Sequence, residues 1–272
     1  MTQPETNAPA AAAYYDDADV ASFYRLCWGG ADIHIGRYDS GAESVAQASA
    51  AMTRHLLDRA GLGPGDRVLD IACGYGGTLR ELADRGCRPA GIDISEVCVA
   101  RAREAISAAG LAGRVGVETG DFHAIDSPDG AWDAAICQES LIHSDDRPRV
   151  FAETFRILRP GGVFAFSDIL TAEGADLAQV AAAFERLGAE AGATPRDYRQ
   201  MARDAGFGIV FDEERPDDIR THYDKLARLL DGPVEGLAPA AAASIAASIA
   251  RWRSALAGGH ITWACFVARK PA

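Results

Sequence analysis

One segment, residues 68–77, limits the folds open to this chain more than any other part of it. It reads Val68-Leu69-Asp70-Ile71-Ala72-Cys73-Gly74-Tyr75-Gly76-Gly77, so a short apolar run leads directly into a glycine-rich stretch. Glycine permits backbone angles that a Cβ atom excludes, and it lets a ligand approach the main chain closely. The segment predicts a buried strand, a tight turn that binds a ligand, and a helix that starts near Thr78.

Apolar strand patterns and helical patterns alternate through the rest of the chain. Strands are expected at residues 68–71, 89–94, 115–119, 134–138, 163–168, 208–212 and 261–269. Helices are expected at residues 19–26, 43–60, 78–85, 96–109 and 149–158. This alternation implies parallel strands joined by right-handed crossovers. The predicted fold is α/β, a doubly wound Rossmann-like sheet of about seven strands with N-terminal helices, a helical insertion that forms a lid, and ligand-binding loops at the strand carboxyl ends.

The length of 272 residues fits one catalytic domain, expected over residues 14–272. Within it we expect an N-terminal helical cap at residues 14–62 and the helical lid insertion at residues 171–206. Residues 1–13 lack the basic start and apolar run of a secretory signal, so no such signal is expected. They are expected to be a disordered leader instead. The Ala-rich stretch at 237–250 contains Pro239 and is too short to cross a bilayer, so a soluble helix is expected there.

The formal net charge of −12 disfavours nucleic acid and anionic membranes as partners. Six cysteines are scattered along the chain without a Cys-x-x-Cys pair, so we expect neither a metal site nor a disulfide framework. Reduced thiols in a cytoplasmic protein are the expectation. The predicted partner is a small molecule, and homo-oligomerisation stays open.

Two common nucleotide-binding motifs do not fit the glycine-rich turn. A dinucleotide-binding turn that begins at Gly74 and Gly76 needs a third glycine at position 79, where this chain has Leu79. There is also no Gly-Lys-Ser/Thr sequence of a phosphate-binding P-loop. The missing third glycine disfavours an NAD-dependent oxidoreductase, and the missing P-loop sequence disfavours an NTPase.

Acidic residues follow the next two predicted strands. Asp93 lies 23 positions after Asp70 and is placed to accept the two hydroxyls of a ribose, while its charge repels a ribose phosphate. Asp121 can accept from an adenine amino group while Phe122 packs on the ring. The ligand is therefore expected to be an adenosine compound with a neutral ribose.

These segments together resemble the class I S-adenosylmethionine (SAM)-dependent methyltransferases, as does Arg159-Pro160-Gly161-Gly162 before an apolar strand. The chain departs from the family at Ala72, where many members have glycine. The resemblance implies SAM as cofactor and, by matching positions, a set of cofactor-binding residues. These residues are Asp70, Ala72, Gly74, Gly76, Asp93, Ile94, Asp121, Phe122 and Gln138.

A narrower resemblance lies in the flanking segments. Tyr14-Tyr15, the stretch from Trp28 to Tyr38, Gln138 to Ser144 and Thr221-His222-Tyr223 are similar to the glycine, sarcosine and dimethylglycine N-methyltransferases that form betaine. Those enzymes typically have Asp where this chain has Glu139. The resemblance implies methylation of a small amine, with His143 and Glu139 as catalytic residues. The implied substrate-binding residues are Tyr24, Trp28, His34, Tyr38 and His143, with Arg37 and His34 as candidates for a substrate carboxylate.

Other interpretations stay open from the sequence. Trp28 and Tyr38 can equally close the core, and His34 and His143 can equally be structural. Because the methyl group of SAM is already activated, a tertiary amine needs no strong base, whereas sarcosine releases one proton to water or to His143. The alternatives are an O- or C-methyltransferase of phenolic, polyketide or isoprenoid products, which would need His143 or Glu139 as a true base, and a non-catalytic nucleotide-binding module.

Overall fold

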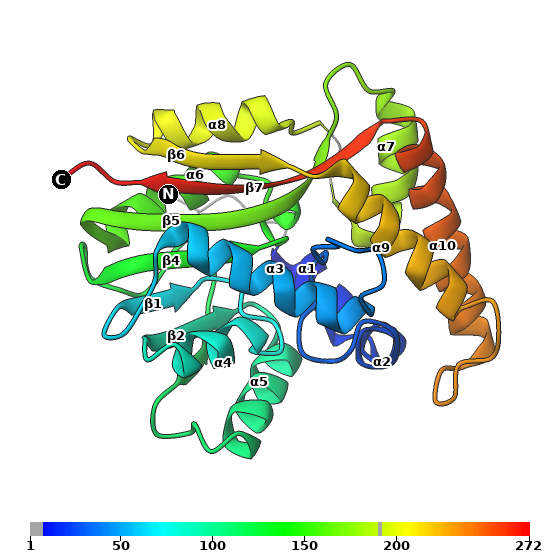
Figure 1. The fold of residues 1–272 in the computed structure, drawn as a ribbon, viewed down its shortest axis with the longest axis horizontal. Helices are drawn as coiled ribbons and strands as arrows, with labels where there is room; N and C mark the ends of the chain where they lie inside the picture. Colours follow the sequence, from blue (N-terminus) through cyan, green and yellow to red (C-terminus); the bar gives the residue numbers. More distant parts are fainter. Residues whose placement is uncertain (1–7, 190–191) are drawn as a thin grey trace.

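The computed structural model describes residues 8–189 and 192–272, with side chains from Ala12 onward (Figure 1). The strands in these ranges are β1 (Arg67–Asp70), β2 (Arg88–Asp93), β3 (Gly116–Thr119), β4 (Trp132–Gln138), β5 (Leu158–Thr171), β6 (Gly208–Glu214) and β7 (Ile261–Arg269). The α-helices are α1 (Ala8–Asp16), α2 (Ala18–Cys27), α3 (Val45–Ala60), α4 (Gly77–Asp84), α5 (Glu96–Ala108), α6 (Arg147–Ile157), α7 (Leu177–Phe184), α8 (Pro195–Asp204), α9 (Pro216–Leu229) and α10 (Pro239–Ala257). Two short 3-10 helices are η1 (Leu141–His143) and η2 (Glu185–Leu187).

All seven strands form one sheet in the order β3-β2-β1-β4-β5-β7-β6. The pairs from β3 to β5 are parallel, and β7 runs antiparallel to both β5 and β6. This confirms the predicted doubly wound sheet. The strand order reverses between β1 and β4, and ligands of such sheets bind beyond the strand carboxyl ends at this crevice. Asp70, Asp93 and Gln138 are the last residues of β1, β2 and β4, so all three lie at that edge.

Alternate residues of the central strands enter two separate cores. Val68, Ala134 and Ala165 belong to the core that contains residues of α3. Leu69, Ala135 and Phe166 belong to the core that contains residues of α6 and α8. Because successive strand residues point to opposite faces, both faces of the sheet are covered by helices. The second core is rich in aromatic rings, with Phe151 packed against Phe164 and Phe166.

A helical layer lies beyond the carboxyl ends of the parallel strands. Figure 1 shows α1, α2, α7, α9 and α10 gathered there, next to the arrowheads of β4 and β6. Helix α10 packs against α7 and α9. The ring of Trp252 in α10 stacks at 5.1 Å on Phe184 of α7 and at 4.8 Å on Tyr223 of α9. No element is expected from the sequence pattern at 216–229, where the structure has α9.

The segments predicted as leader, cap and lid do not each form one separate unit in the structure. Residues 1–7 of the leader lie outside the described residues, whereas residues 8–13 belong to α1. In the cap segment, α2 lies at the strand ends and α3 packs on the sheet against β5 and β7. In the lid segment, α7 joins the helical layer, but α8 packs against α6 and β6 and so covers a face of the sheet. Within the described ranges, no helix combines the length and apolar character needed to span a bilayer.

Candidate functional site

The glycine-rich turn after β1 adopts the backbone geometry predicted for it. Gly74 and Gly76 have φ angles of +51° and +78°, in the left-handed region that residues with a Cβ rarely occupy. At Gly77, a Cβ atom would lie 1.8 Å from Oδ1 of Asp32 and 2.6 Å from the carbonyl oxygen of Ala31. The loop before α3 therefore packs directly on the turn, which only glycine allows.

A cavity opens at this turn, and we call it the cofactor cavity. Five of the predicted cofactor-binding residues line it, namely Asp70, Ala72, Gly74, Asp93 and Gln138. Its wall also includes Tyr15, residues 31–34, Tyr75, Thr78 and Glu139. The space between the lining atoms, open mouth included, is about 490 Å³. The other predicted cofactor residues, Gly76, Ile94, Asp121 and Phe122, do not line it.

Asp93 connects β2 to the glycine-rich turn. Its Oδ2 accepts the backbone N–H of Gly74 at 2.8 Å, and its Oδ1 accepts the N–H of Ser95 at 3.0 Å. Burial raises the pKa of Asp93, and the two N–H donors oppose that rise. Each carboxylate oxygen keeps further lone pairs, so the side chain can still accept the hydroxyls of a ribose.

Gln138 and Asp70 offer acceptors for a cationic group of the ligand. Nε2 of Gln138 donates to Oγ1 of Thr78 at 2.8 Å, while its buried Oε1 has no hydrogen-bond partner among the described residues. A buried acceptor without a donor is costly unless a ligand supplies one. Asp70 lines the same cavity, and burial raises its pKa to about 7. The cofactor cavity therefore offers acceptors from Asp93, Gln138 and Asp70 to hydroxyl or ammonium donors of a ligand.

Asp121 and Phe122 lie beside this edge but belong to a different network. Oδ1 of Asp121 lies 2.8 Å from Nδ1 of His123, and Nε2 of His123 lies 2.8 Å from Oγ of Ser144. The nearly buried His123 thus links the loop after β3 to the segment after η1. The sequence around His123 predicts no role for it, because nothing in the local pattern shows that Ser144 lies against its ring.

Glu139 follows β4 with a φ angle of +55°, the only described non-glycine residue with positive φ. Its Oε1 accepts the backbone N–H of Ile35 at 2.7 Å and Nε1–H of Trp263 at 2.8 Å. Burial raises the pKa of Glu139 to about 8, although both donors favour the charged form. The side chain therefore holds the loop before α3 against β7 and also provides a carboxyl group that titrates near neutral pH.

His143 lies in η1 and contacts the N-terminal helix. Its Nε2 lies 3.1 Å from the hydroxyl oxygen of Tyr15, and its buried Nδ1 has no partner among the described residues. Burial, together with the charge of Arg147, lowers the pKa of His143 to about 4. The ring is neutral at physiological pH. Because Tyr15 also lines the cofactor cavity, the contact joins the edge of that cavity to η1.

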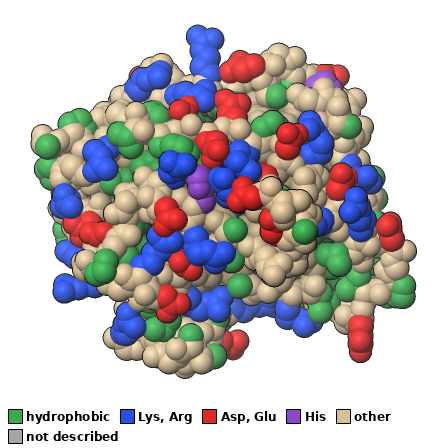
Figure 2. All heavy atoms as spheres, in the orientation of Figure 1, with side chains coloured by type: hydrophobic (Ala, Val, Ile, Leu, Met, Phe, Trp, Pro, Cys, Tyr) green, Lys and Arg blue, Asp and Glu red, His purple; other side chains and the backbone are tan. Residues whose placement is uncertain are grey.

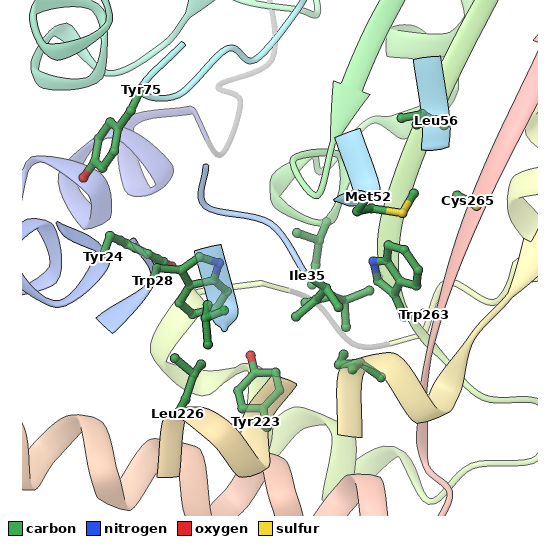
Figure 3. Packing of buried hydrophobic residues seen from close by; sticks show 14 of the residues in the cluster. Tyr24, Trp28, Ile35, Met52, Leu56, Tyr75, Tyr223, Leu226, Trp263 and Cys265 are labelled. Atoms are coloured by element: carbon green, nitrogen blue, oxygen red, sulfur yellow. The ribbon is translucent and has the colours of Figure 1, made fainter. Parts of the chain in front are cut away.

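A second cavity, the aromatic cavity, lies between α2, α9 and α10. It is lined by Tyr14, Phe23, Tyr24, Trp28, Arg186, Leu187, Tyr223, Leu226, Ser248, Ile249 and Trp252. Figure 3 shows Tyr24 and Trp28 facing Leu226 and Tyr223 across this region. Rings of Tyr15 and Tyr24 stack at 5.9 Å, and Tyr15 lines the cofactor cavity, so this tyrosine pair separates the two cavities. Of the residues that the sequence implies for substrate binding, Tyr24 and Trp28 line this cavity.

The structure places the other predicted substrate residues elsewhere. His34 lines the cofactor cavity, and its Nε2 contacts Oγ1 of Thr53 at 3.0 Å. Tyr38 lines neither cavity, and its hydroxyl lies 3.0 Å from Nδ1 of His222. Because Nδ1 of His222 also accepts the N–H of Gly36, the proton of this neutral ring is on Nε2. The centroid of the His222 ring lies 4.5 Å from that of Trp28, which lines the aromatic cavity. Tyr38 therefore contacts the cavity wall only indirectly, through His222.

Arg37, a candidate for a substrate carboxylate, belongs to a surface network instead. Its guanidinium pairs with Asp39 at 3.0 Å and with Glu213 at 3.5 Å. Figure 2 shows basic and acidic side chains interspersed over the face of the molecule it draws. Ligand atoms of His55, Glu213 and Cys265 lie within 4.8 Å of one another here. The guanidinium contacts both His55 and Glu213, and its charge opposes binding of a cation among them.

Comparisons with known proteins agree with this geometry. A family model described as a methyltransferase domain matches residues 68–162. The sarcosine/dimethylglycine N-methyltransferase of Halorhodospira halochloris is 34% identical over 264 residues, 94% of each chain. The dimethylglycine N-methyltransferase of Parasynechococcus marenigrum is 33% identical over 267 residues, 96% of this chain and 95% of that one.

A solved structure gives the same result. The crystal structure of a candidate sarcosine dimethylglycine methyltransferase from Galdieria sulphuraria superposes with a TM-score of 0.87 and 29% identity, covering 94% of this chain and 99% of that one. The similarity covers 94% of the chain and so extends well beyond residues 68–162, the part that the family model matches. The chain therefore belongs to the class I SAM-dependent methyltransferases and is similar over nearly its whole length to sarcosine and dimethylglycine N-methyltransferases.

Proposed function

We propose that this methyltransferase transfers the methyl group of SAM to the nitrogen of a small amino-acid amine, with sarcosine and dimethylglycine as acceptors. The observation that carries the proposal is the aromatic cavity, which shares a tyrosine boundary with the cofactor cavity. The names of the relatives above support it, since they act on these amines.

The aromatic lining suits an amine that becomes a cation. Methylation of a tertiary amine produces a quaternary ammonium, and an aromatic face stabilises such a group by about 0.5–2 kcal/mol. Tyr24 and Trp28 have ring centroids 5.1 Å apart, and both line the cavity. Because the positive charge grows during the reaction, this wall favours the transition state over the neutral amine.

The residues of the cofactor cavity bind and orient the cofactor. When bound, SAM supplies a methyl group already activated on a sulfonium. Asp93 is proposed to accept the ribose hydroxyls, and Gln138 and Asp70 to accept from the ammonium group. Asp121 and Phe122 are proposed to contact the adenine, next to Ile94, and the turn at Ala72, Gly74 and Gly76 to let the cofactor approach the backbone.

The two proposed acceptors differ in whether methylation releases a proton. Dimethylglycine with a free lone pair releases no proton on methylation, so the neutral His143 is not needed as a base. Sarcosine releases one proton, and we assign its uptake to Oε2 of Glu139, since Oε1 already accepts two N–H groups. Burial raises the pKa of Glu139 to about 8, so its carboxylate form, which has to be present for the uptake, is a stronger base than an ordinary carboxylate.

We further propose that residues 14–272 form one catalytic unit in which α1, α2 and α7 cover the site. Ser95 donates from its Oγ to Oδ1 of Asp16 at 2.6 Å, which ties the end of α1 to the edge of the cofactor cavity. All six cysteines are buried and unpaired, which is typical of a protein that works in the reducing cytoplasm.

A methyl-transfer assay read by product mass tests the proposal. The acceptors are glycine, sarcosine, dimethylglycine, a set of phenols and a set of isoprenyl compounds. We expect products from sarcosine and dimethylglycine only. Methylation of a phenol or an isoprenyl compound, with none of the amines, would overturn the amine assignment and leave the chain an O- or C-methyltransferase.

A further inference from the structure

Arg186 is the one charged side chain among the described residues that line the aromatic cavity. It lies in η2, and its guanidinium carbon is 5.8 Å from the ring centroid of Tyr14. In residues 12–189 and 192–272, no carboxylate lies within 4.0 Å of this guanidinium, whereas the adjacent Glu185 pairs with Arg251 at 3.5 Å. Arg186 thus presents an anion-binding group to a space whose other lining residues, apart from Ser248, are aromatic or aliphatic.

Arg186 also borders a second, more open cavity. An open cavity on the outer side of α1 and α2 has about 1,190 Å³ between its lining atoms, mouth included. Tyr14, Arg186 and Leu187 line both this outer cavity and the aromatic cavity. The two cavities therefore share part of their wall at this guanidinium, and three carboxylates, those of Asp17, Asp19 and Glu185, also line the outer cavity.

The chemistry of a guanidinium identifies the ligand group that fits here. Arginine binds a carboxylate through two parallel N–H donors, and a partly buried guanidinium gains most from such a partner. An acceptor held at Arg186 by its carboxylate would extend its amine away from η2. The boundary formed by Tyr15 and Tyr24 lies in the same cavity wall, next to the cofactor cavity.

We infer that Arg186 binds the carboxylate of the amino-acid acceptor and so selects amino acids over amines that lack this group. The inference rests on the proposed function and adds a residue for substrate specificity to it. It replaces Arg37 and His34 in that role, because both are held by other partners.

Steady-state kinetics with two acceptors test the inference. Dimethylglycine carries the carboxylate, and N,N-dimethylglycinamide has a neutral amide in its place. We expect Arg186→Met to raise KM for dimethylglycine about 10- to 100-fold and to remove the preference over the amide. Arg186→Lys should restore part of that preference. The control Arg196→Met removes an exposed arginine of α8 that lines neither cavity, and it should behave as the wild type.

Calorimetric titrations separate the possible results. SAM binding should be the same in Arg186→Met and the wild type, and weaker binding would show a structural role for Arg186 and overturn the inference. An unchanged KM and an unchanged preference for dimethylglycine would also overturn it, while the amine assignment would stand. Binding of dimethylglycine in the presence of S-adenosylhomocysteine, lost in Arg186→Met but without methyl transfer in the wild type, would support the carboxylate site and refute the proposed function.

Discussion

The hydroxyl oxygen of Tyr15 lies 3.1 Å from Nε2 of His143, across 128 residues of sequence. This contact joins α1, at the start of the described chain, to η1 after the fourth strand. The two rings meet edge to face with centroids 5.5 Å apart. The contact therefore links Tyr15, which lines the cofactor cavity, to a buried His143 that does not line it, and both side chains are neutral at neutral pH.

Replacement of His143 tests whether its side chain acts as a base. We expect His143→Gln to lower the rate with dimethylglycine by less than about tenfold, because the pKa of His143 is lowered to about 4 and the tertiary amine has no proton to lose. His260→Gln, at the turn before β7, is the control. A loss of about 10⁴-fold would instead show obligatory proton transfer by His143.

Replacement of Asp93 should weaken SAM binding. In Asp93→Ala, the ribose hydroxyls lose a charged acceptor, and hydrogen bonds to charged groups are worth about 1.5–3 kcal/mol each. The expected loss of affinity is about 10- to 100-fold, measured by calorimetric titration. Asp126→Ala, an exposed carboxylate after β3, should bind SAM as the wild type does. Equal affinity of a folded Asp93→Ala variant would make Asp93 purely structural.

Glu139 should give the protein a measurable dependence of stability on pH. Its folded pKa of about 8 lies above its ordinary value of 4.5, so the folded state binds the proton more tightly. Its contribution to the free energy of unfolding is therefore greatest below about pH 4.5 and falls by about 1.4 kcal/mol per pH unit until about pH 8. Glu139→Gln should lack this part of the decline, as denaturant unfolding at several pH values would show. The exposed control Glu118→Gln should keep it, and parallel pH dependences of Glu139→Gln and the wild type would contradict the prediction.

The aromatic wall should contribute to catalysis with an amine. Trp28→Leu removes a ring that lines the aromatic cavity, so kcat/KM for dimethylglycine should fall about 2- to 30-fold, equivalent to about 0.5–2 kcal/mol. Trp132→Leu is the control for the general loss of an aromatic residue, because Trp132 starts β4 and lies at the end of that strand away from Gln138 and the cofactor cavity. Circular dichroism checks the fold of each variant. If Trp28→Leu keeps the wild-type efficiency, the ring serves only to pack the core.

Much of the fold follows from local patterns in the chain. The seven expected strands are all present in one sheet, and the glycine-rich turn has the expected backbone angles. The sequence pattern did not predict α9, because its many polar residues and its first residue, Pro216, are also typical of a loop. It also did not predict that α8 covers the sheet, because an amphipathic helix fits a lid and a sheet face equally well.

The candidate site divides in the same way between sequence and tertiary structure. The sequence by itself determined the cofactor-binding edge, because Asp70, Asp93 and Gln138 end strands of a parallel sheet and such ends meet at one edge. Only the tertiary structure decided which flanking side chains line the aromatic cavity. It turned Arg37 to the surface, put Tyr38 behind Trp28 and brought Arg186 to the aromatic cavity. Such choices depend on how helices distant in sequence pack together, and no local pattern encodes those contacts.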